Sequence, residues 1–477
     1  MPLSSPEYLL CFLPIIVAVT VLFRRSGHLR AAMQWLVLAS LFFYGYARPV
    51  ALIILFASVI FNYFCGTQIT KKQKSWLAVG IIGNLLLLGT FKYATFFAGM
   101  IGVQEKLPSL VLPLAISFYT FTQIAYLVDA SRGNAKAHSF VDYLLFVTFF
   151  PNLLAGPIAR HSELAPQFTK KPSPGVSPDL AIGMTMLIIG LFKKVVIADT
   201  IATYANLVFN GATSGMVPTF AEAWIGALAY TMQLYFDFSG YSDMAIGSAR
   251  MMGFVLPVNF NAPYRSLSIR EFWKRWHMTL SRFIQEYLYI PLGGSRKGEV
   301  RTLVNLLVTM LLAGLWHGAG WTFVIWGGLH GVYLVINRIW TKMGMKLNGI
   351  LALPLTLLSI VVGWVFFRAD SLTTAMTMLQ SMAGLNGMHW TLTGSSLATP
   401  LVWWRAGQML IALAVLVMVA PTTQAFLGID DAKPDGSVLQ IRWKPTVLFA
   451  LCSMILAVTS ITTLFLSQEH VFLYFQF

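Results

Sequence analysis

The chain has 477 residues, of which 57% are hydrophobic and only 11% are charged. Soluble domains carry about 25% charged residues. This composition therefore excludes a soluble protein and indicates one polytopic membrane domain spanning residues 1–477. The net charge of +15 is spread among the apolar runs, which disfavours nucleic-acid binding and fits cytoplasmic loops in contact with anionic membrane lipids.

The first 130 residues alternate apolar runs with short connections. A straight helix needs roughly 20 apolar residues to cross a bilayer core. The strongly basic connections near Arg24, Lys71 and Arg132 can all be placed in the cytoplasm if the N-terminus lies outside. The runs that predict crossings are 8–23, 31–46, 50–64, 76–91 and 110–128.

This alternation fails after residue 140. The stretch 142–154 is short and apolar, and the next loop, 160–171, is basic again. Two successive basic loops favour a re-entrant element over an ordinary short span. Irregular backbone at such depth must be shielded by protein or line a cavity.

Polar residues interrupt the apolar runs in the middle of the chain. Residues 180–198 predict a span in which Lys193 and Lys194 snorkel to an interface. A further span, 219–236, leads into Asp237 and Asp243, and a carboxylate costs roughly 2.5–3.5 kcal/mol at a membrane centre. Either a pairing arginine or a wet cavity offsets that cost and gives these residues a function, or both lie at an interface beside Arg250.

The stretch 269–288 has apolar residues at helical spacing and charged residues on the opposite side. It is too charged to span a membrane. We therefore expect one interfacial helix whose aromatic rings point into the bilayer, with His277 held toward the protein interior.

The remaining apolar runs complete the chain. Between the last two of them, Asp430, Asp431 and Asp435 indicate an acidic surface loop. The runs that predict spans are 303–316, 321–337, 351–367, 407–420 and 446–466.

His317 ends an apolar run beside Trp316 and Gly318. Burial disfavours the charged imidazole, so His317 is expected to be a neutral base at pH 7. Such a base can take a proton from a hydroxyl that attacks an acyl carbonyl. Gly314, Gly318 and Gly320 would let backbone or substrate come close. The alternative is a structural histidine hydrogen-bonded between helices.

The other histidines carry weaker signals. His330 suits packing, or a supporting role beside His317. The rest lie in basic loops or near span ends and are expected to be solvated, namely His28, His138, His161, His389 and His470.

Other chemistries are poorly supported. The chain has no Gly-x-Ser-x-Gly elbow for a serine hydrolase. Its 3 cysteines have no paired spacing, and His317 and His330 lack a ligand spacing, so we expect neither a disulfide framework nor a metal site.

Several long motifs resemble the membrane-bound O-acyltransferase family, and most closely its bacterial alginate O-acetylase branch. The resemblance runs over nearly the whole chain. The motifs that carry it are Phe272–Ser281, Tyr289–Gly294, Gly314–Gly318, Asp237–Asp243, Ala155–Arg160 and Phe472–Phe477.

The resemblance implies an all-α polytopic membrane fold, a bowl of about 11–13 tilted helices around a central tunnel, with re-entrant segments on the cytoplasmic side. His317 matches the family's active-site histidine, and His277 matches the position of a second polar catalytic residue. The protein would lie in a bacterial inner membrane and bind no cofactor. It would pass acetyl groups from cytosolic acetyl-CoA to an extracytoplasmic partner that decorates alginate, cellulose or another exopolysaccharide.

The resemblance also extends the set of candidate binding residues. The stretch 269–288 becomes a wall of the donor entrance, where Lys274 or Arg275 would bind CoA phosphates by charge-assisted hydrogen bonds. Further candidates for contact with donor or substrate are Trp276, Trp316, Asp237, Asp243 and His330.

Two other interpretations stay open from the sequence. One is a transporter or flippase of an acyl or sugar intermediate without chemistry of its own, although the inverted repeats common in such folds are not visible here. The other keeps the acyl transfer but has a lipid or a protein as acceptor.

Overall fold

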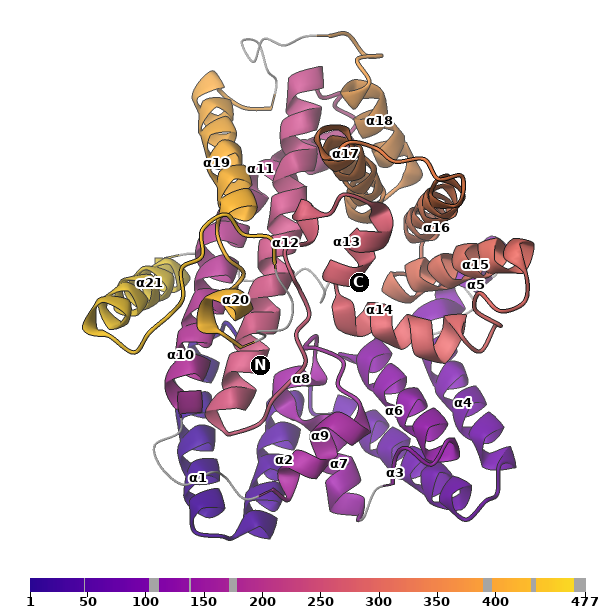
Figure 1. Cartoon of the computed structure of the whole chain (residues 1–477), viewed down its shortest axis with the longest axis vertical. Coiled ribbons are helices and arrows are strands. Elements are labelled where there is room, and N and C mark those ends of the chain that lie inside the picture. The colour runs from indigo at the N-terminus through magenta and orange to yellow at the C-terminus, as the bar shows by residue number, and fades with distance from the viewer. Residues whose placement is uncertain are drawn as a thin grey trace. The chain divides into compact units, whose positions relative to one another are not determined.

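The computed structural model describes residues 1–46, 48–102, 111–136, 139–170, 178–388, 397–429 and 435–466. Within these residues the regular structure is helical and there is no strand (Figure 1). This described part contains 8 helices long and apolar enough to cross a membrane. Helices satisfy their own backbone hydrogen bonds, as a lipid environment requires. The prediction of an all-α polytopic membrane protein is confirmed.

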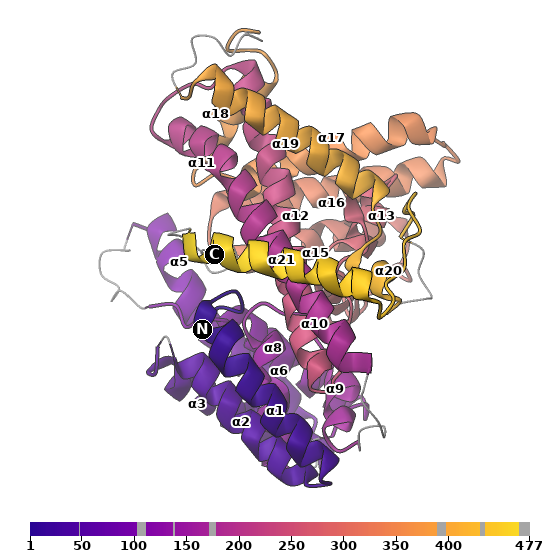
Figure 2. The same ribbon diagram turned by 90° about the vertical axis from the view of Figure 1, so that its left-hand side faces the viewer.

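Each of the first predicted spans contains a helix. Helices α3, α4 and α6 pack on one another (Figure 1), and α1 packs on α2 (Figures 1 and 2). The elements are η1 (Tyr8–Phe12), α1 (Leu13–Arg25), α2 (Leu29–Gly45), α3 (Ala51–Thr70), α4 (Ser75–Leu88), η2 (Gly89–Tyr93), α5 (Ala94–Met100) and α6 (Ile116–Ser131).

The stretch predicted to re-enter forms two short helices, α7 (Phe140–Thr148) and α8 (Phe150–Leu153). The backbone N–H of Phe150 donates to Ser40 Oγ at 3.2 Å, next to the break between them. Residues 143–155 are buried, so their irregular backbone is shielded by protein. Neither helix is long enough to cross a bilayer, and re-entry itself stays a prediction.

Helix α9 (His161–Phe168) begins at a histidine that we expected to be solvated. That expectation is wrong, because the His161 ring is buried 5.1 Å from the Tyr126 ring and 5.0 Å from the Phe146 ring. His28 is exposed as expected. The other three histidines read as solvated, His138, His389 and His470, lie outside the described residues.

The second half of the chain forms longer helices. The predicted span 180–198 is the first part of a longer helical stretch, and 219–236 is the first half of α12. The elements are α10 (Pro178–Leu191), η4 (Phe192–Ala198), α11 (Asp199–Thr213), α12 (Phe220–Met251), η5 (Pro263–Arg265), α13 (Ile269–Arg275), α14 (Met278–Ile284), η6 (Gln285–Tyr289), α15 (Glu299–His317), α16 (Trp321–Lys342), α17 (Gly349–Arg368), α18 (Leu372–Met382), α19 (Pro400–Val419), α20 (Thr423–Leu427) and α21 (Val447–Leu466).

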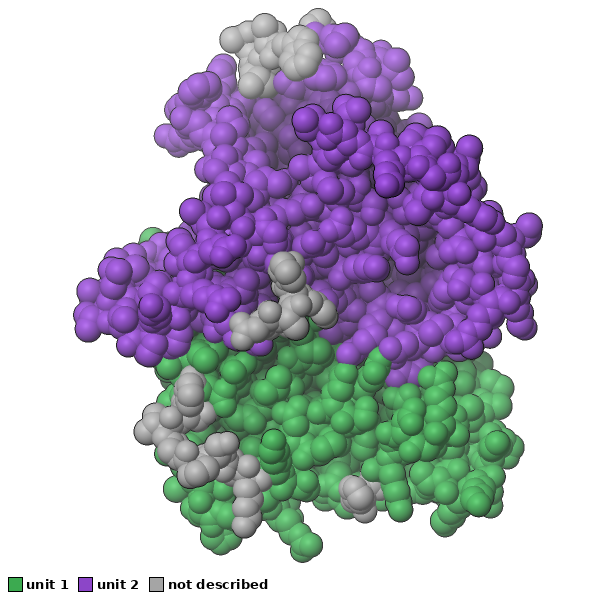
Figure 3. Space-filling model, in the orientation of Figure 1, with its two compact units in different colours: residues 1–191, 241–258, 464–476 green, residues 192–240, 259–463, 477 purple. Residues whose placement is uncertain are grey.

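The helices fall into two compact units (Figure 3). Unit 1 comprises residues 1–191, 241–258 and 464–476, and unit 2 comprises residues 192–240, 259–463 and 477. Helix α12 contributes residues to both, and the single membrane domain stays a prediction. His277, His317 and His330 all belong to unit 2.

A buried ion pair corrects two of our expectations. The Lys194 side chain does not snorkel, since it is only 2% exposed and its Nζ lies 2.6 Å from Asp199 Oδ1 and 2.9 Å from Asp237 Oδ1. A cation therefore offsets the burial of Asp237, but it is Lys194 and not the arginine that we expected. Arg250 pairs with Asp179 at 2.9 Å. The physical reason is that a buried carboxylate needs a charge in direct contact.

Two neighbouring residues were also expected at an interface. Lys193 is half-buried and its Nζ donates to Thr423 Oγ1 at 2.7 Å within unit 2, while its place at a membrane interface stays a prediction. Asp243 is buried, which is contrary to a place at an interface, and it lies in unit 1.

Helices α15 and α16 form a hairpin whose backbones touch at two glycines. A Cβ on Gly314 would lie 2.3 Å from the carbonyl oxygen of Phe323, and a Cβ on Gly327 would lie 2.3 Å from that of Met310. The close approach expected at Gly314 is therefore a contact between the backbones of α15 and α16. This contact fixes the hairpin that carries His317 and His330.

Gly327→Ala should lower the melting temperature of the purified protein, because its methyl group has no room and overpacking costs about 1–3 kcal/mol. Gly328→Ala is the matched control, since a Cβ there meets only Leu311 Cδ2 at 3.4 Å. Thermal unfolding followed by tryptophan fluorescence in detergent measures both variants. Equal losses of melting temperature would contradict the proposed backbone contact.

Candidate active site

His277 lies in a sharp bend between α13 and α14, so the prediction of one continuous helix over 269–288 is wrong. Its φ of 41° is in the left-handed region, which is uncommon for a residue other than glycine. Hydrogen bonds from outside the helix hold both sides of the bend. The N–H of Asn261 donates to the Arg275 carbonyl and the N–H of Met278 donates to the Asn259 carbonyl, both at 2.9 Å.

The bend also turns the aromatic rings away from the direction we expected. Trp276 is buried, and its ring stacks on those of Phe272 at 5.6 Å and Tyr264 at 6.1 Å. The Trp364 ring of α17 lies 5.0 Å away. The prediction that the rings of this stretch point into the bilayer is therefore wrong for Phe272 and Trp276. Packing against α17 and the Tyr264 segment buries them within unit 2.

The His277 side chain is only 1% exposed. Its Nδ1 lies 3.1 Å from Asn259 Oδ1, and its ring meets the Phe238 ring edge-on at 4.7 Å. Burial lowers the pKa of His277 to about 3, so the imidazole is neutral at physiological pH.

His317 is the last residue of α15 and is 5% exposed. Three rings surround its imidazole, those of Trp316 at 4.8 Å, Trp326 at 5.1 Å and Phe367 at 5.2 Å. All three meet it at steep angles, so the imidazole has little freedom to rotate. An imidazole held in this way has a fixed direction for proton transfer.

His330 is fully buried in an aromatic box. The rings around it include Trp326 at 5.0 Å, Trp273 at 5.2 Å and Tyr333 at 5.7 Å. Trp326 thus contacts both His317 and His330. Its ring also stacks on Trp364 at 5.9 Å, which contacts Trp276 beside His277, so one aromatic cluster joins the surroundings of all three histidines.

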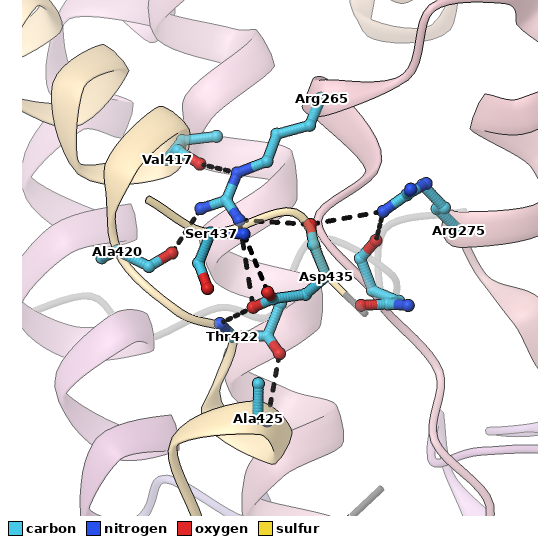
Figure 4. A network of polar contacts seen from close by, with 9 residues as sticks. Arg265, Arg275, Val417, Ala420, Thr422, Ala425, Asp435 and Ser437 are labelled. Atoms are coloured by element: carbon cyan, nitrogen blue, oxygen red, sulfur yellow. Dashed lines mark hydrogen bonds and ion pairs between the residues drawn. The ribbon is translucent and has the colours of Figure 1, made fainter. Parts of the chain in front are cut away.

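The predicted donor-binding cations differ in their surroundings. Lys274 is exposed. Arg275 is engaged inside the protein, because its Nε donates to Glu271 Oε1 at 2.9 Å and its Nη1 donates to the carbonyl oxygens of Asn261 and Asp435 (Figure 4). A role of either residue toward CoA phosphates stays a prediction. Asp237 is held by Lys194 in unit 2, whereas Asp243 belongs to unit 1.

A network around Arg265 was not predicted from the sequence (Figure 4). Its guanidinium donates to the carbonyl oxygens of Val417 and Ala420 and thereby caps the C-terminus of α19. It also donates to the Asp435 carbonyl at 3.2 Å. The same carbonyl accepts from Arg275, so this network supports the segment that carries His277.

Asp435 is buried, which makes the prediction of an acidic surface loop wrong at this residue. Its carboxylate accepts the N–H groups of Thr422 at 2.7 Å and Ser437 at 2.9 Å. The Asp-Gly-Ser sequence is a turn signal that indicates the second of these bonds. The first depends on a long-range contact. The other two acidic residues, Asp430 and Asp431, lie outside the described residues.

The sequence analysis also missed the contact of Asn259 with His277 and the contact of Lys194 with Asp237. Asn259 follows Pro257 in an apolar stretch, and nothing nearby in the sequence indicates that it contacts His277. Lys194 stands out as a cation within an apolar run, which could have suggested a buried partner as readily as snorkelling.

Comparison with known proteins adds independent information. Residues 128–366, which contain all three histidines, match the family model described as "MBOAT, membrane-bound O-acyltransferase family". The chain is 43% identical to a peptidoglycan O-acetyltransferase of Helicobacter pylori over 81% of this chain and 80% of that protein. It is 42% identical to a probable alginate O-acetylase of Pseudomonas aeruginosa over 87% and 81%, and 40% identical to one of Pseudomonas putida over all of both chains.

The Asp435 carboxyl should make stability depend on pH. Burial raises the pKa of this carboxyl. The hydrogen bonds from Thr422 and Ser437 and the charge of Arg265 together lower it by more, so its pKa in the folded protein is below the ordinary value. Such a group stabilises the fold above the unfolded-state pKa, about 3.9, and loses this effect as the pH falls through the folded-state pKa. Asp435→Asn should therefore lower the melting temperature at pH 7 and flatten its fall in acid.

Asp370→Asn is the control for this measurement, because Asp370 is exposed. Its melting temperature should follow the wild-type pH dependence in a scan from neutral to acidic pH. A wild-type slope retained in Asp435→Asn would contradict the role assigned to this carboxylate.

Proposed function

Because this chain belongs to the membrane-bound O-acyltransferase family, we propose that it acetylates an exopolysaccharide, with His317 as the general base and cytosolic acetyl-CoA as the donor. It is a multi-pass membrane protein and an O-acyltransferase. Beyond this, we propose the donor, a location in a bacterial inner membrane, the direction of transfer and the acceptor. We favour an enzyme over a transporter that carries out no chemistry of its own.

The observation that carries the proposal is the setting of His317. This buried imidazole ends a helix that is long and apolar enough to cross a membrane, and three aromatic rings fix its orientation. It lies within the part of the chain that matches the family. A fixed imidazole shielded from bulk water suits general-base catalysis better than a solvated one.

The chemical step transfers one acetyl group and moves one proton. The imidazole of His317 takes the proton from the acceptor hydroxyl while that oxygen attacks the thioester carbonyl carbon. A carbon–oxygen bond forms, the carbon–sulfur bond breaks, and CoA leaves as a thiolate that takes the proton from the imidazolium. His277 acts as the second polar residue of the reaction.

The acceptor lies on the other side of the membrane from the donor in this proposal. The acceptor hydroxyl belongs to an extracytoplasmic partner that modifies the polymer, and it reaches His317 through the central passage expected for this family. The acetyl group leaves by the same passage as an ester on that oxygen. Alginate is favoured because several relatives of about 40% identity bear the name alginate O-acetylase. Peptidoglycan is the second candidate, because the Helicobacter pylori relative is a peptidoglycan O-acetyltransferase.

His317→Ala should insert into the membrane normally and lose about 10²–10⁴-fold in acetyl transfer, the usual contribution of a general base. Purified protein in lipid nanodiscs, given acetyl-CoA and a soluble acceptor, is assayed for release of the CoA thiol. His28→Ala is the matched control, because His28 is exposed in a loop, and it should keep wild-type activity. Undiminished thiol release by His317→Ala would refute the proposed role.

The acceptor can be identified in a deletion strain. Exopolysaccharide and peptidoglycan are extracted from wild-type, deleted and complemented cells, and their ester acetate is measured. Loss from the exopolysaccharide alone supports the favoured acceptor, and loss from peptidoglycan alone supports the second. Unchanged ester acetate on both polymers would exclude both acceptors.

A further inference from the structure

Three hydrogen-bonding atoms converge on one oxygen beside His277. Asn259 is fully buried, and its Oδ1 lies 2.9 Å from Thr279 Oγ1, 3.3 Å from the Thr279 backbone nitrogen and 3.1 Å from His277 Nδ1. A backbone N–H can only donate, so its partner must be the amide oxygen of Asn259 and not the amide nitrogen. This contact settles the orientation of the Asn259 side chain.

The identity of that atom fixes the proton on the imidazole. A side-chain amide oxygen carries no hydrogen, so the hydrogen bond to His277 exists only if Nδ1 bears the proton. A neutral imidazole has a single N–H, and its Nε2 therefore carries the lone pair. The neutral side chain free in water prefers the opposite form, so the protein imposes the less common tautomer.

The main chain holds Asn259 firmly against the bend. The Asn259 carbonyl accepts the N–H of Met278 at 2.9 Å, on the far side of His277. Two residues on, the N–H of Asn261 donates to the Arg275 carbonyl, also at 2.9 Å. The segment 259–261 is thus bonded to the chain on both sides of His277, which fixes the backbone of Asn259 beside the bend. The two Thr279 hydrogen bonds hold the Asn259 side-chain oxygen in place.

We propose that Asn259 is a positioning residue that holds His277 as its Nδ1–H tautomer and leaves the lone pair of Nε2 to accept a hydrogen bond from the reacting groups during acyl transfer. The inference rests on the proposed function, in which His277 takes part in the reaction. The Nδ1–H bond to Asn259 is kept while Nε2 accepts that hydrogen bond, and it becomes stronger because hydrogen bonds in a chain polarise one another.

The tautomer can be observed without any turnover. The full-length protein is labelled with ¹⁵N-histidine, reconstituted in lipid and studied by solid-state NMR, and the His277 signals are identified as those missing from His277→Ala. In the wild type we expect a protonated Nδ1 and an unprotonated Nε2. Asn259→Ala should shift the population to the Nε2–H form, whereas Asn259→Asp, which keeps an accepting oxygen, should not.

Thr279→Val is the matched control. It removes a hydrogen bond to the same Asn259 oxygen, at 2.9 Å, but leaves the bond to the imidazole. It should therefore keep the wild-type tautomer.

In the acetyl-transfer assay, Asn259→Ala should lower kcat about 10-fold to 10²-fold with little change in KM, because the lost effect acts on the reacting state. Thr279→Val should stay close to the wild type.

The outcomes separate this proposal from the proposed function. A wild-type His277 with its proton on Nε2 would overturn the proposal even if Asn259→Ala does not fold. So would an unchanged tautomer, or an unchanged kcat, in folded Asn259→Ala. If the tautomer shifts as expected but His317→Ala retains full acetyl transfer, then the proposed function fails while the assignment of the His277 proton stands.

Discussion

The constraint on which this structure most depends is that its buried polar groups must find partners inside the protein, because lipid offers none. Lys194 meets it by lying between the carboxylates of Asp199 and Asp237. Asn62 and Asn84 meet it in unit 1 by exchanging hydrogen bonds of 3.2 and 2.6 Å. Each such pair joins two helices at a defined register, which apolar packing alone specifies less strictly.

The aromatic cluster around His317 departs from this rule. Both ring nitrogens of His330 and the indole nitrogen of Trp326 are buried without a hydrogen-bond partner among the described residues. Each such atom costs about 1–3 kcal/mol. Ring packing offsets that cost only if the fit is tight, and Gly363 shows that it is, since a Cβ there would lie 2.8 Å from His330 Nε2. The protein thus surrounds His317 with rigid, apolar ring packing, although the ring nitrogens of His330 and Trp326 have no hydrogen-bond partner among the described residues.

The sequence predicted what depends on local patterns and failed where distant residues intervene. Apolar runs located α1 to α4, because the length of a helix in lipid is set by bilayer thickness. The same reasoning placed His317 at a helix end. It missed the bend at His277, because the hydrogen bonds that replace the helical ones come from segment 259–261. It misjudged Lys194 and Asp435 for the same reason, since their partners are brought close only by folding.

The bend at His277 shows how the two kinds of information combine. The motif around Trp276 and His277 resembles that of the family, yet as a regular helix it would have presented its rings to lipid. Arg265 caps α19 and, with Arg275, donates to the Asp435 carbonyl, while the main chain of 259–261 clamps both sides of the bend. These residues do not belong to the motif. They convert an amphipathic stretch into an inward-facing imidazole, so the orientation of the His277 side chain is a property of unit 2 as a whole, whereas the motif itself is readable from the sequence.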